Sequence, residues 1–62
     1  MKISLKAARI NAGLTVKEVA KALNLTSQSI YNIENNIVKI DIKKAQQLAE
    51  LYKLDINNIN FF

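Results

Sequence analysis

The stretch of sequence that decides the fold is residues 15–36, which read TVKEVAKALNLTSQSIYNIENN. Its first half predicts a short helix capped by Thr15, because Glu18 follows three residues later, as in a capping box. Asn24 interrupts the helical pattern, and Asn tolerates the left-handed conformation that a sharp turn needs. Four apolar side chains share one face of this helix at the i, i+3, i+4, i+7 spacing: Val16, Val19, Ala20 and Leu23.

A second short helix is predicted from about Ser27 to Asn35, with Thr26 as its cap. Ile30 and Ile33 point to one side of it, and the opposite side carries no lysine or arginine. Hydroxyl, amide and phenol groups donate and accept hydrogen bonds, as the edges of DNA bases require. Two short helices joined by a tight turn therefore indicate a unit that places the second helix in the major groove. The polar side gathers Ser27, Gln28, Tyr31, Asn32 and Asn35.

Residues on both sides of this helix pair also match the sequence pattern of one known family. The match runs from about Leu5 to Ile59 without a gap. Taken together, these residues resemble the Cro/C1-type helix-turn-helix family of phage repressors and their bacterial relatives. The resemblance implies an all-α, lambda-repressor-like fold of five short helices, in which the second and third read DNA. It rests on Arg9, Gly13, Leu14, Thr15, Val19, Ala20, Leu25, Thr26, Ile30, Ile33, Glu34, Asn35, Leu48, Ala49, Leu54, Asp55 and Ile56.

The chain departs from the family pattern at two positions. The family usually has Gln where this chain has Val16, and that Gln commonly holds a phosphate. We expect this contact to be lost or left to backbone N–H groups. The family usually has Gly after the recognition helix, where this chain has Asn36, the next-best residue for a left-handed cap.

Two further helices are predicted on either side of the helix pair. One spans Ser4 or Leu5 to Ala12 and ends at Gly13. The other begins after the cap Asp41 and runs to about Tyr52. The side chains expected to face the core are Leu5, Ala8, Ala12, Ala45, Leu48, Ala49 and Tyr52.

Length and composition restrict the class of protein. The 62 residues form one expected domain, residues 1–62, near the lower size limit for folding on a hydrophobic core alone. Without Cys or His, we expect no disulfide, no metal and no cofactor. The net charge of +4 favours a polyanionic partner. No apolar run reaches membrane-spanning length and no signal peptide is recognisable, so we expect a cytoplasmic protein that does not bind membranes.

Arg9 and Glu34 are expected to form a structural ion pair. In the family, the matching Arg and Glu form a partly buried pair that ties the first helix to the recognition helix. The competing interpretation makes Arg9 a phosphate ligand. Both roles can coexist, because Arg has five donors.

Four side chains are candidates for reading bases: Ser27, Gln28, Tyr31 and Asn32. Gln28 suits a bidentate contact to adenine N6 and N7, and the alternative is a solvated surface amide. Ser27 can touch a phosphate instead of a base. Tyr31 can meet a thymine methyl group or a phosphate, or it can stack on a neighbouring helix.

Contacts to the DNA backbone are expected from two places. One is the start of the first helix of the pair, aided by its dipole, and the other lies at and beyond the end of the second. The remaining lysines, Lys2, Lys6, Lys21 and Lys53, are expected to be solvated charge. The candidate backbone contacts are Thr15, Val16, Lys17, Asn35, Asn36, Lys39, Lys43 and Lys44.

The tail of the chain combines apolar residues with two adjacent aromatics. A short fifth helix is predicted after Asp55, carrying Ile56 and Ile59. A fully exposed Phe pair in so small a domain favours association. We therefore expect Ile59, Phe61 or Phe62 to build a two-fold homodimer interface, which Ile37 and Val38 extend. In the alternative, one Phe folds back onto the core.

The function expected from these features is sequence-specific binding of double-stranded DNA by a small phage-type or bacterial repressor. It would act as a homodimer on a pseudo-palindromic operator, by occlusion and without a small-molecule effector. The alternative is an antitoxin or other partner-binding regulator of the same fold, and a third class is a domain of this fold that binds only protein. An enzyme is not expected, because the chain has no His, Cys or Gly-rich phosphate loop.

Overall fold

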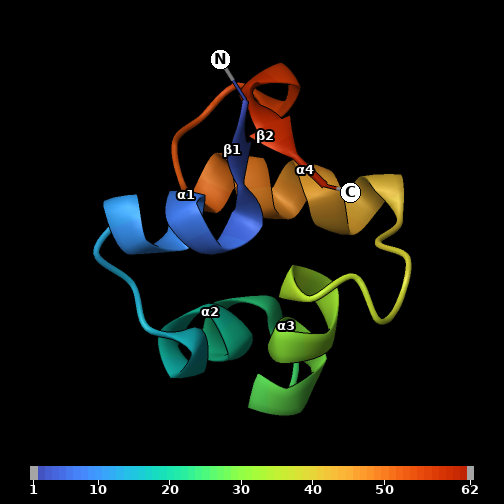
Figure 1. The fold of residues 1–62 in the computed structure, drawn as a ribbon. Coiled ribbons are helices and arrows are strands. Elements are labelled where there is room, and N and C mark those ends of the chain that lie inside the picture. Colours follow the sequence, from blue (N-terminus) through green and yellow to red (C-terminus); the bar gives the residue numbers. More distant parts are fainter. Residues whose placement is uncertain (1, 62) are drawn as a thin grey trace.

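A computed structural model describes residues 2–61 as a helical fold with a small sheet at one end (Figure 1). Within these residues there are four α-helices, one 3-10 turn and two short strands. None of the helices is long and apolar enough to cross a membrane. The elements in chain order are β1 (Ile3–Ser4), α1 (Leu5–Asn11), α2 (Val16–Leu23), α3 (Ser27–Glu34), α4 (Ile42–Leu51), the 3-10 turn η1 (Ile56–Asn58) and β2 (Ile59–Asn60).

Each α-helix begins at a residue whose side chain accepts a hydrogen bond from an amide three positions later. Ser4, Thr15, Thr26 and Asp41 cap α1, α2, α3 and α4 in this way. At α2 the bond is reciprocated, because the amide of Thr15 donates to the Glu18 carboxylate over 2.9 Å. The predicted capping box and the predicted starts of all four α-helices are therefore confirmed.

The four α-helices also end alike, each with a left-handed residue just beyond its last turn. The residue after it donates its amide to a carbonyl five positions earlier, as Leu25 does to Ala20 over 2.8 Å. Asn24 and Asn36 both have φ of 58°, as their predicted turn and cap roles require. Gly13 has φ of 74° and open space around it, so its conformation rather than crowding favours glycine. The fourth left-handed residue, Lys53, was not predicted.

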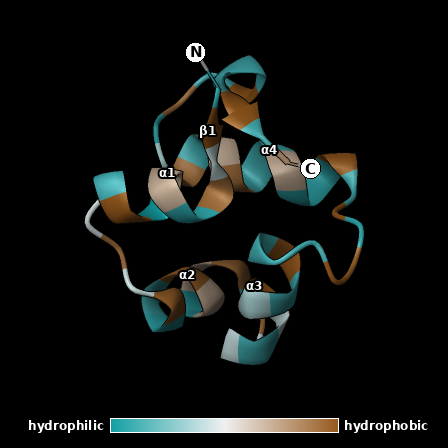
Figure 2. Cartoon of the chain, viewed as in Figure 1, coloured by the Kyte–Doolittle hydropathy of each residue, from teal (hydrophilic) through white to brown (hydrophobic). Residues whose placement is uncertain are grey.

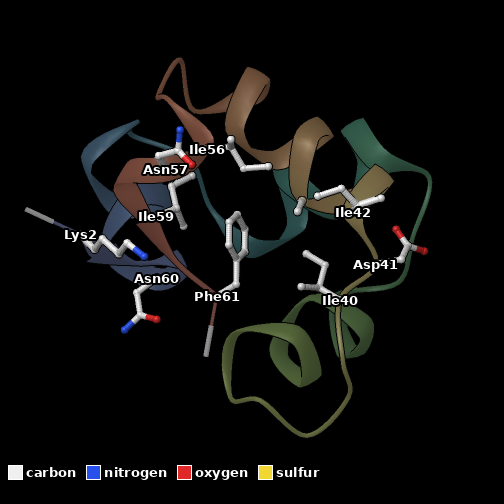
Figure 3. Close-up of a pocket in the computed structure, with 10 residues that line it drawn as sticks. Lys2, Ile40, Asp41, Ile42, Ile56, Asn57, Ile59, Asn60 and Phe61 are labelled. Carbon is white, nitrogen blue, oxygen red and sulfur yellow. The ribbon is translucent and has the colours of Figure 1, made fainter.

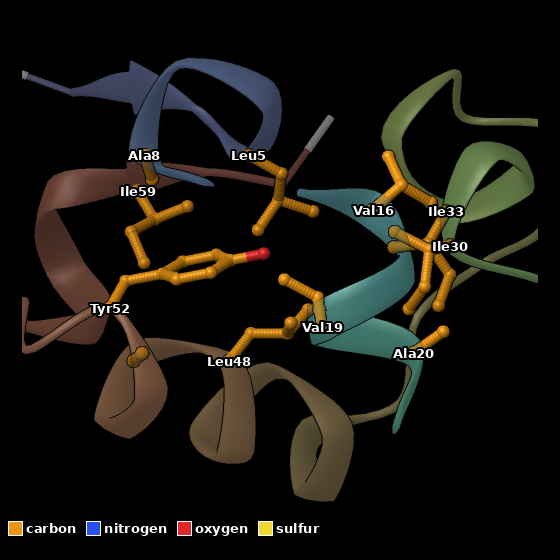
Figure 4. Packing of buried hydrophobic residues seen from close by; sticks show 11 residues of the cluster. Leu5, Ala8, Val16, Val19, Ala20, Ile30, Ile33, Leu48, Tyr52 and Ile59 are labelled. Atoms are coloured by element: carbon orange, nitrogen blue, oxygen red, sulfur yellow. The ribbon is translucent and has the colours of Figure 1, made fainter. Parts of the chain in front are cut away.

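The core is formed by the inward side of every helix together with Ile59 (Figure 4). The predicted core positions are confirmed except for Ala12, which is exposed. That prediction is wrong because α1 ends one residue earlier and Ala12 is its C-terminal cap, which no other element covers. The buried cluster contains Leu5, Ala8, Val16, Val19, Ala20, Ile30, Ile33, Leu48, Ala49, Tyr52 and Ile59.

The predicted fifth helix is wrong, although the mainly helical fold is confirmed. Residues Ile56–Asn58 make a single 3-10 turn capped by Asp55, and Ile59 then adopts an extended conformation. Asn57 and Asn58 are weak helix formers, and the β-branched Ile59 suits a strand. β2 pairs in parallel with β1, with Ile3 opposite Ile59 and Ser4 opposite Asn60. This pairing joins the two ends of the described chain and buries Ile59 beneath it.

Candidate nucleic-acid interface

α2 and α3 form a helix–turn–helix pair that buries one side of α3 and presents the other to solvent. Ile30 and Ile33 are buried in the same core cluster as Val19 and Ala20 of α2, and the two helices are in contact. Hydrophilic and near-neutral residues cover most of α3 in the hydropathy colouring of Figure 2. The outward face of α3 is therefore an exposed, mostly polar surface on a capped helix.

The four predicted base-reading residues lie together on this outward face. Ser27, Gln28 and Tyr31 are exposed, and Asn32 is half-buried. The side chain of Gln28 donates from Nε2 to Oδ1 of Asn32 over 3.0 Å. Tyr31 is 48% exposed, so part of its side chain is accessible from solvent. The sequence had not revealed that Gln28 and Asn32 are bonded to each other, although their spacing of four residues permits it.

The start of α2 offers fewer donors than the sequence suggested. The amide of Thr15 is occupied by Glu18, and the Thr15 hydroxyl accepts from the Glu18 amide over 3.1 Å. The side chain of Val16 is buried, so only its backbone could meet a ligand. Since the first amides of a helix lack acceptors within it, those of Val16 and Lys17 are the donors that remain here.

Several cations lie around the C-terminal end of α3. Lys39 and Lys43 are exposed, and neither forms an ion pair within residues 2–61. The Lys44 ammonium lies 3.6 Å from Asp41. The pKa of Asp41 is lowered, chiefly by a hydrogen bond from the backbone amide of Lys44, so this carboxylate stays charged and partly offsets Lys44.

The loop that carries Lys39 also encloses a small groove against α3. The exposed Asn35 and Asn36 lead from α3 into this loop. The groove has a volume of about 210 Å³ and is lined by Leu25, Ser29, Asn32, Ile33, Val38, Lys39, Ile40, Asp41 and Lys44.

Arg9 and Glu34, expected to pair, are in contact at the C-terminal end of α3. Arg9 Nε lies 2.8 Å from Glu34 Oε2, and Nη2 lies 3.5 Å from Oε1. Arg9 Nη1 also donates to the carbonyl of Leu14 over 3.1 Å. The two side chains are only 11% and 5% exposed, so Arg9 has little surface left for the alternative role of phosphate ligand.

Tyr52 lies close to this ion pair, which the sequence did not indicate. Its ring lies in the core between Ile59 and Leu48 (Figure 4). Burial raises the pKa of Tyr52 to about 12, with a further increase from the charge of Glu34 and an opposing effect from Arg9. The phenol therefore stays neutral to a higher pH than an exposed tyrosine would.

A second, larger groove lies between the tail and the start of α4 (Figure 3). Its volume is about 450 Å³, and the half-buried Phe61 ring forms part of its wall. Phe61 packs against the core, as in the alternative where one Phe folds back, and Phe62 lies outside the described residues. The groove is lined by Lys2, Ile40, Asp41, Ile42, Ala45, Ile56, Asn57, Ile59, Asn60 and Phe61.

The expected role of Ile59 in a dimer interface is wrong. Its side chain is only 2% exposed, because the pairing of β2 with β1 holds it in the core. Exposed apolar side chains between α3 and the start of α4 are instead Ile37 and Ile42, each 69% exposed, and Val38. We refer to Ile37, Val38 and Ile42 as the apolar patch.

Comparison with known proteins gives one match. A family model described as Helix-turn-helix matches residues 5–59. No curated protein and no solved structure is significantly similar to the chain. Within residues 2–61 no group of three or more acidic side chains is placed to hold a metal ion.

Proposed function

Because this chain belongs to the Cro/C1-type helix-turn-helix family of DNA-binding regulators, we propose that it binds duplex DNA sequence-specifically and represses transcription. Domains of this family are typically not enzymes. In the proposed complex α3 is the recognition helix and lies in the major groove. Repression follows from occlusion of the operator, since a protein bound there blocks access to the same DNA.

The observation that carries this proposal is the uncharged hydrogen-bonding face of α3. Ser27, Gln28, Tyr31 and Asn32 present hydroxyl, amide and phenol groups to solvent from one side of a capped helix. A helix with its side chains is about 10–12 Å across, and the major groove is about 12 Å wide. Each base pair presents a distinct pattern of donors and acceptors in that groove, and neutral polar groups can match it.

Cations near the outward face of α3 supply the sequence-independent part of the affinity for DNA. Lys39 and Lys43 are free of ion pairs within the described residues, and they lie beyond the C-terminal end of α3. Lysines beyond one end of the helix suit contacts with phosphates at the edge of the major groove, which fix position without reading sequence. The amides of Val16 and Lys17 supply a second, uncharged contact at the start of α2.

The proposed DNA complex contains two copies of the chain. One recognition helix reads few base pairs, whereas a two-fold dimer places two in successive major grooves about 34 Å apart. The apolar patch beyond the end of α3 replaces Ile59 as the proposed interface.

The same patch also favours a second candidate function. A regulator of this fold that is an antitoxin would cover Ile37 and Ile42 with a different protein. Purification of the native complex distinguishes the two, because a homodimer contains one kind of chain and an antitoxin complex contains two different ones.

Gln28→Ala tests the proposed function most simply. If Gln28 reads a base, its loss costs about 1–3 kcal/mol on the preferred site and relaxes preference at one base pair. Binding to random DNA should barely change. An equal loss on all sequences would place Gln28 on the DNA backbone and contradict its assignment as a base reader.

A further inference from the structure

Two amide side chains on the outward face of α3 are hydrogen-bonded to each other. Gln28 and Asn32 are four residues apart, a spacing at which side chains on a helix meet. Gln28 donates its Nε2 proton to Asn32 Oδ1 over 3.0 Å. Asn32 is the more constrained of the two side chains, because it is half-buried and lines the smaller groove between α3 and the loop that carries Lys39. Gln28 is exposed.

This bond changes what Gln28 can offer to a base. A glutamine amide has two N–H donors and one carbonyl oxygen. Because one N–H of Gln28 donates to Asn32, Gln28 has one N–H donor and its carbonyl acceptor left for a base. Adenine presents an acceptor at N7 and a donor at N6, which this remaining pair matches. Guanine presents two acceptors, N7 and O6, and two donors are needed to satisfy both.

We propose that Asn32 is a positioning residue that sets the base preference of Gln28 in favour of adenine over guanine. The inference rests on the proposed function, since it specifies how the same face of α3 reads DNA. By occupying one N–H, Asn32 directs the Gln28 oxygen and its second N–H outward together. The effect falls on base preference more than on folding, because a side-chain pair at this spacing adds little to helix stability.

The test compares dissociation constants for duplexes that differ at one base pair, the one whose preference Gln28→Ala relaxes. The wild-type protein should prefer adenine there. Asn32→Ala should lower the adenine-over-guanine ratio by about 2- to 13-fold, the net contribution of one hydrogen bond. Asn58→Ala removes an exposed Asn outside the helix pair and should leave the ratio unchanged.

Asn32→Asp separates the positioning role from simple loss of the side chain. Aspartate keeps an oxygen that accepts from Gln28, so the adenine-over-guanine ratio should be retained. Its negative charge should weaken binding to every duplex alike, since DNA is a polyanion. A ratio that falls as far in Asn32→Asp as in Asn32→Ala would overturn the proposal.

A measurement on the free protein tests the pair without DNA. The Gln28 side-chain amide resonances should shift on Asn32→Ala but not on Asn58→Ala, with thermal unfolding showing that both variants fold. Unchanged Gln28 resonances, an unchanged base ratio in Asn32→Ala, or a wild-type preference for guanine would each overturn the inference. A wild-type protein that selects no DNA sequence would instead contradict the proposed function itself.

Discussion

Arg9 connects three parts of the chain through one guanidinium group. It pairs with Glu34 at the end of α3 and donates to the Leu14 carbonyl in the turn before α2. Both members of the pair are nearly buried, so water cannot replace a lost partner. The contact therefore ties α3 to α1 and to the turn before α2.

Removing one member of the pair should destabilise the fold strongly. Glu34→Leu leaves a buried guanidinium unpaired, which typically costs about 3–5 kcal/mol. Arg9→Met combined with Glu34→Leu should recover much of that loss, because apolar side chains of similar size often replace a buried pair without penalty. The measurement is a double-mutant cycle by urea unfolding, and additive effects of the single changes would contradict the coupling. If the single variants do not fold, folding of the double variant alone establishes the same coupling.

Tyr52 gives a pH-dependent test of the packing beneath this pair. Its pKa is raised from 10.0 to about 12, so the folded state favours the neutral phenol. The resulting stability is fully present below pH 10 and is lost as the pH rises through about 12. The free energy of unfolding should thus fall over this window more steeply in the wild type than in Tyr52→Phe. Equal slopes for wild type and Tyr52→Phe would contradict the burial of the phenol.

The helices show which parts of the structure the sequence can predict. Their starts were predicted because capping is local: Thr15 and Glu18 lie within one turn and satisfy each other. The core face of α4 was predicted because its apolar residues follow the helical period. Ala12 also follows the period, but no neighbouring element covers it, and burial depends on neighbours that a local pattern does not contain.

The elements that were missed depend on contacts between distant residues. The strands β1 and β2 are two residues each, and their pairing requires the two ends of the described chain to meet. No local pattern marks so short a parallel pair, and Ile59 was assigned to the surface for that reason. Likewise, the residue types of Gln28 and Asn32 were predicted on the reading face, whereas their mutual bond depends on side-chain conformations.

The loop after α3 gives a prediction at the scale of an element. Lys39 is exposed and proposed to contact a phosphate, so Lys39→Ala should weaken binding to specific and random DNA alike. The plot of log binding constant against log salt concentration should become shallower by about one unit of slope, since one fewer counterion is released. Lys6→Ala removes an exposed lysine of α1 as a control and should leave the slope unchanged. A wild-type slope in Lys39→Ala would place this lysine away from the DNA.

The proposed dimer belongs to the scale of the whole molecule, and substitutions in the apolar patch can test it. Ile42→Lys changes a side chain that is 69% exposed, so the monomer should fold normally. The variant should remain monomeric in sedimentation equilibrium and bind a two-half-site operator about 100-fold more weakly, because the second half-site no longer adds to affinity. Ile10→Lys adds the same charge at a side chain 57% exposed on α1 and should behave as wild type. A dimer that persists in Ile42→Lys would place the interface elsewhere.

The central claim is that α3 reads DNA sequence as part of a two-fold assembly. Selection of bound duplexes from a random pool by the full chain, at physiological salt, tests it most directly. The account predicts enrichment of two inverted half-sites with centres about 10–10.5 base pairs apart. The selected duplex should bind at least about 1,000-fold more tightly than random DNA. Enrichment of no sequence, with equal affinity for selected and random duplexes, would contradict the claim.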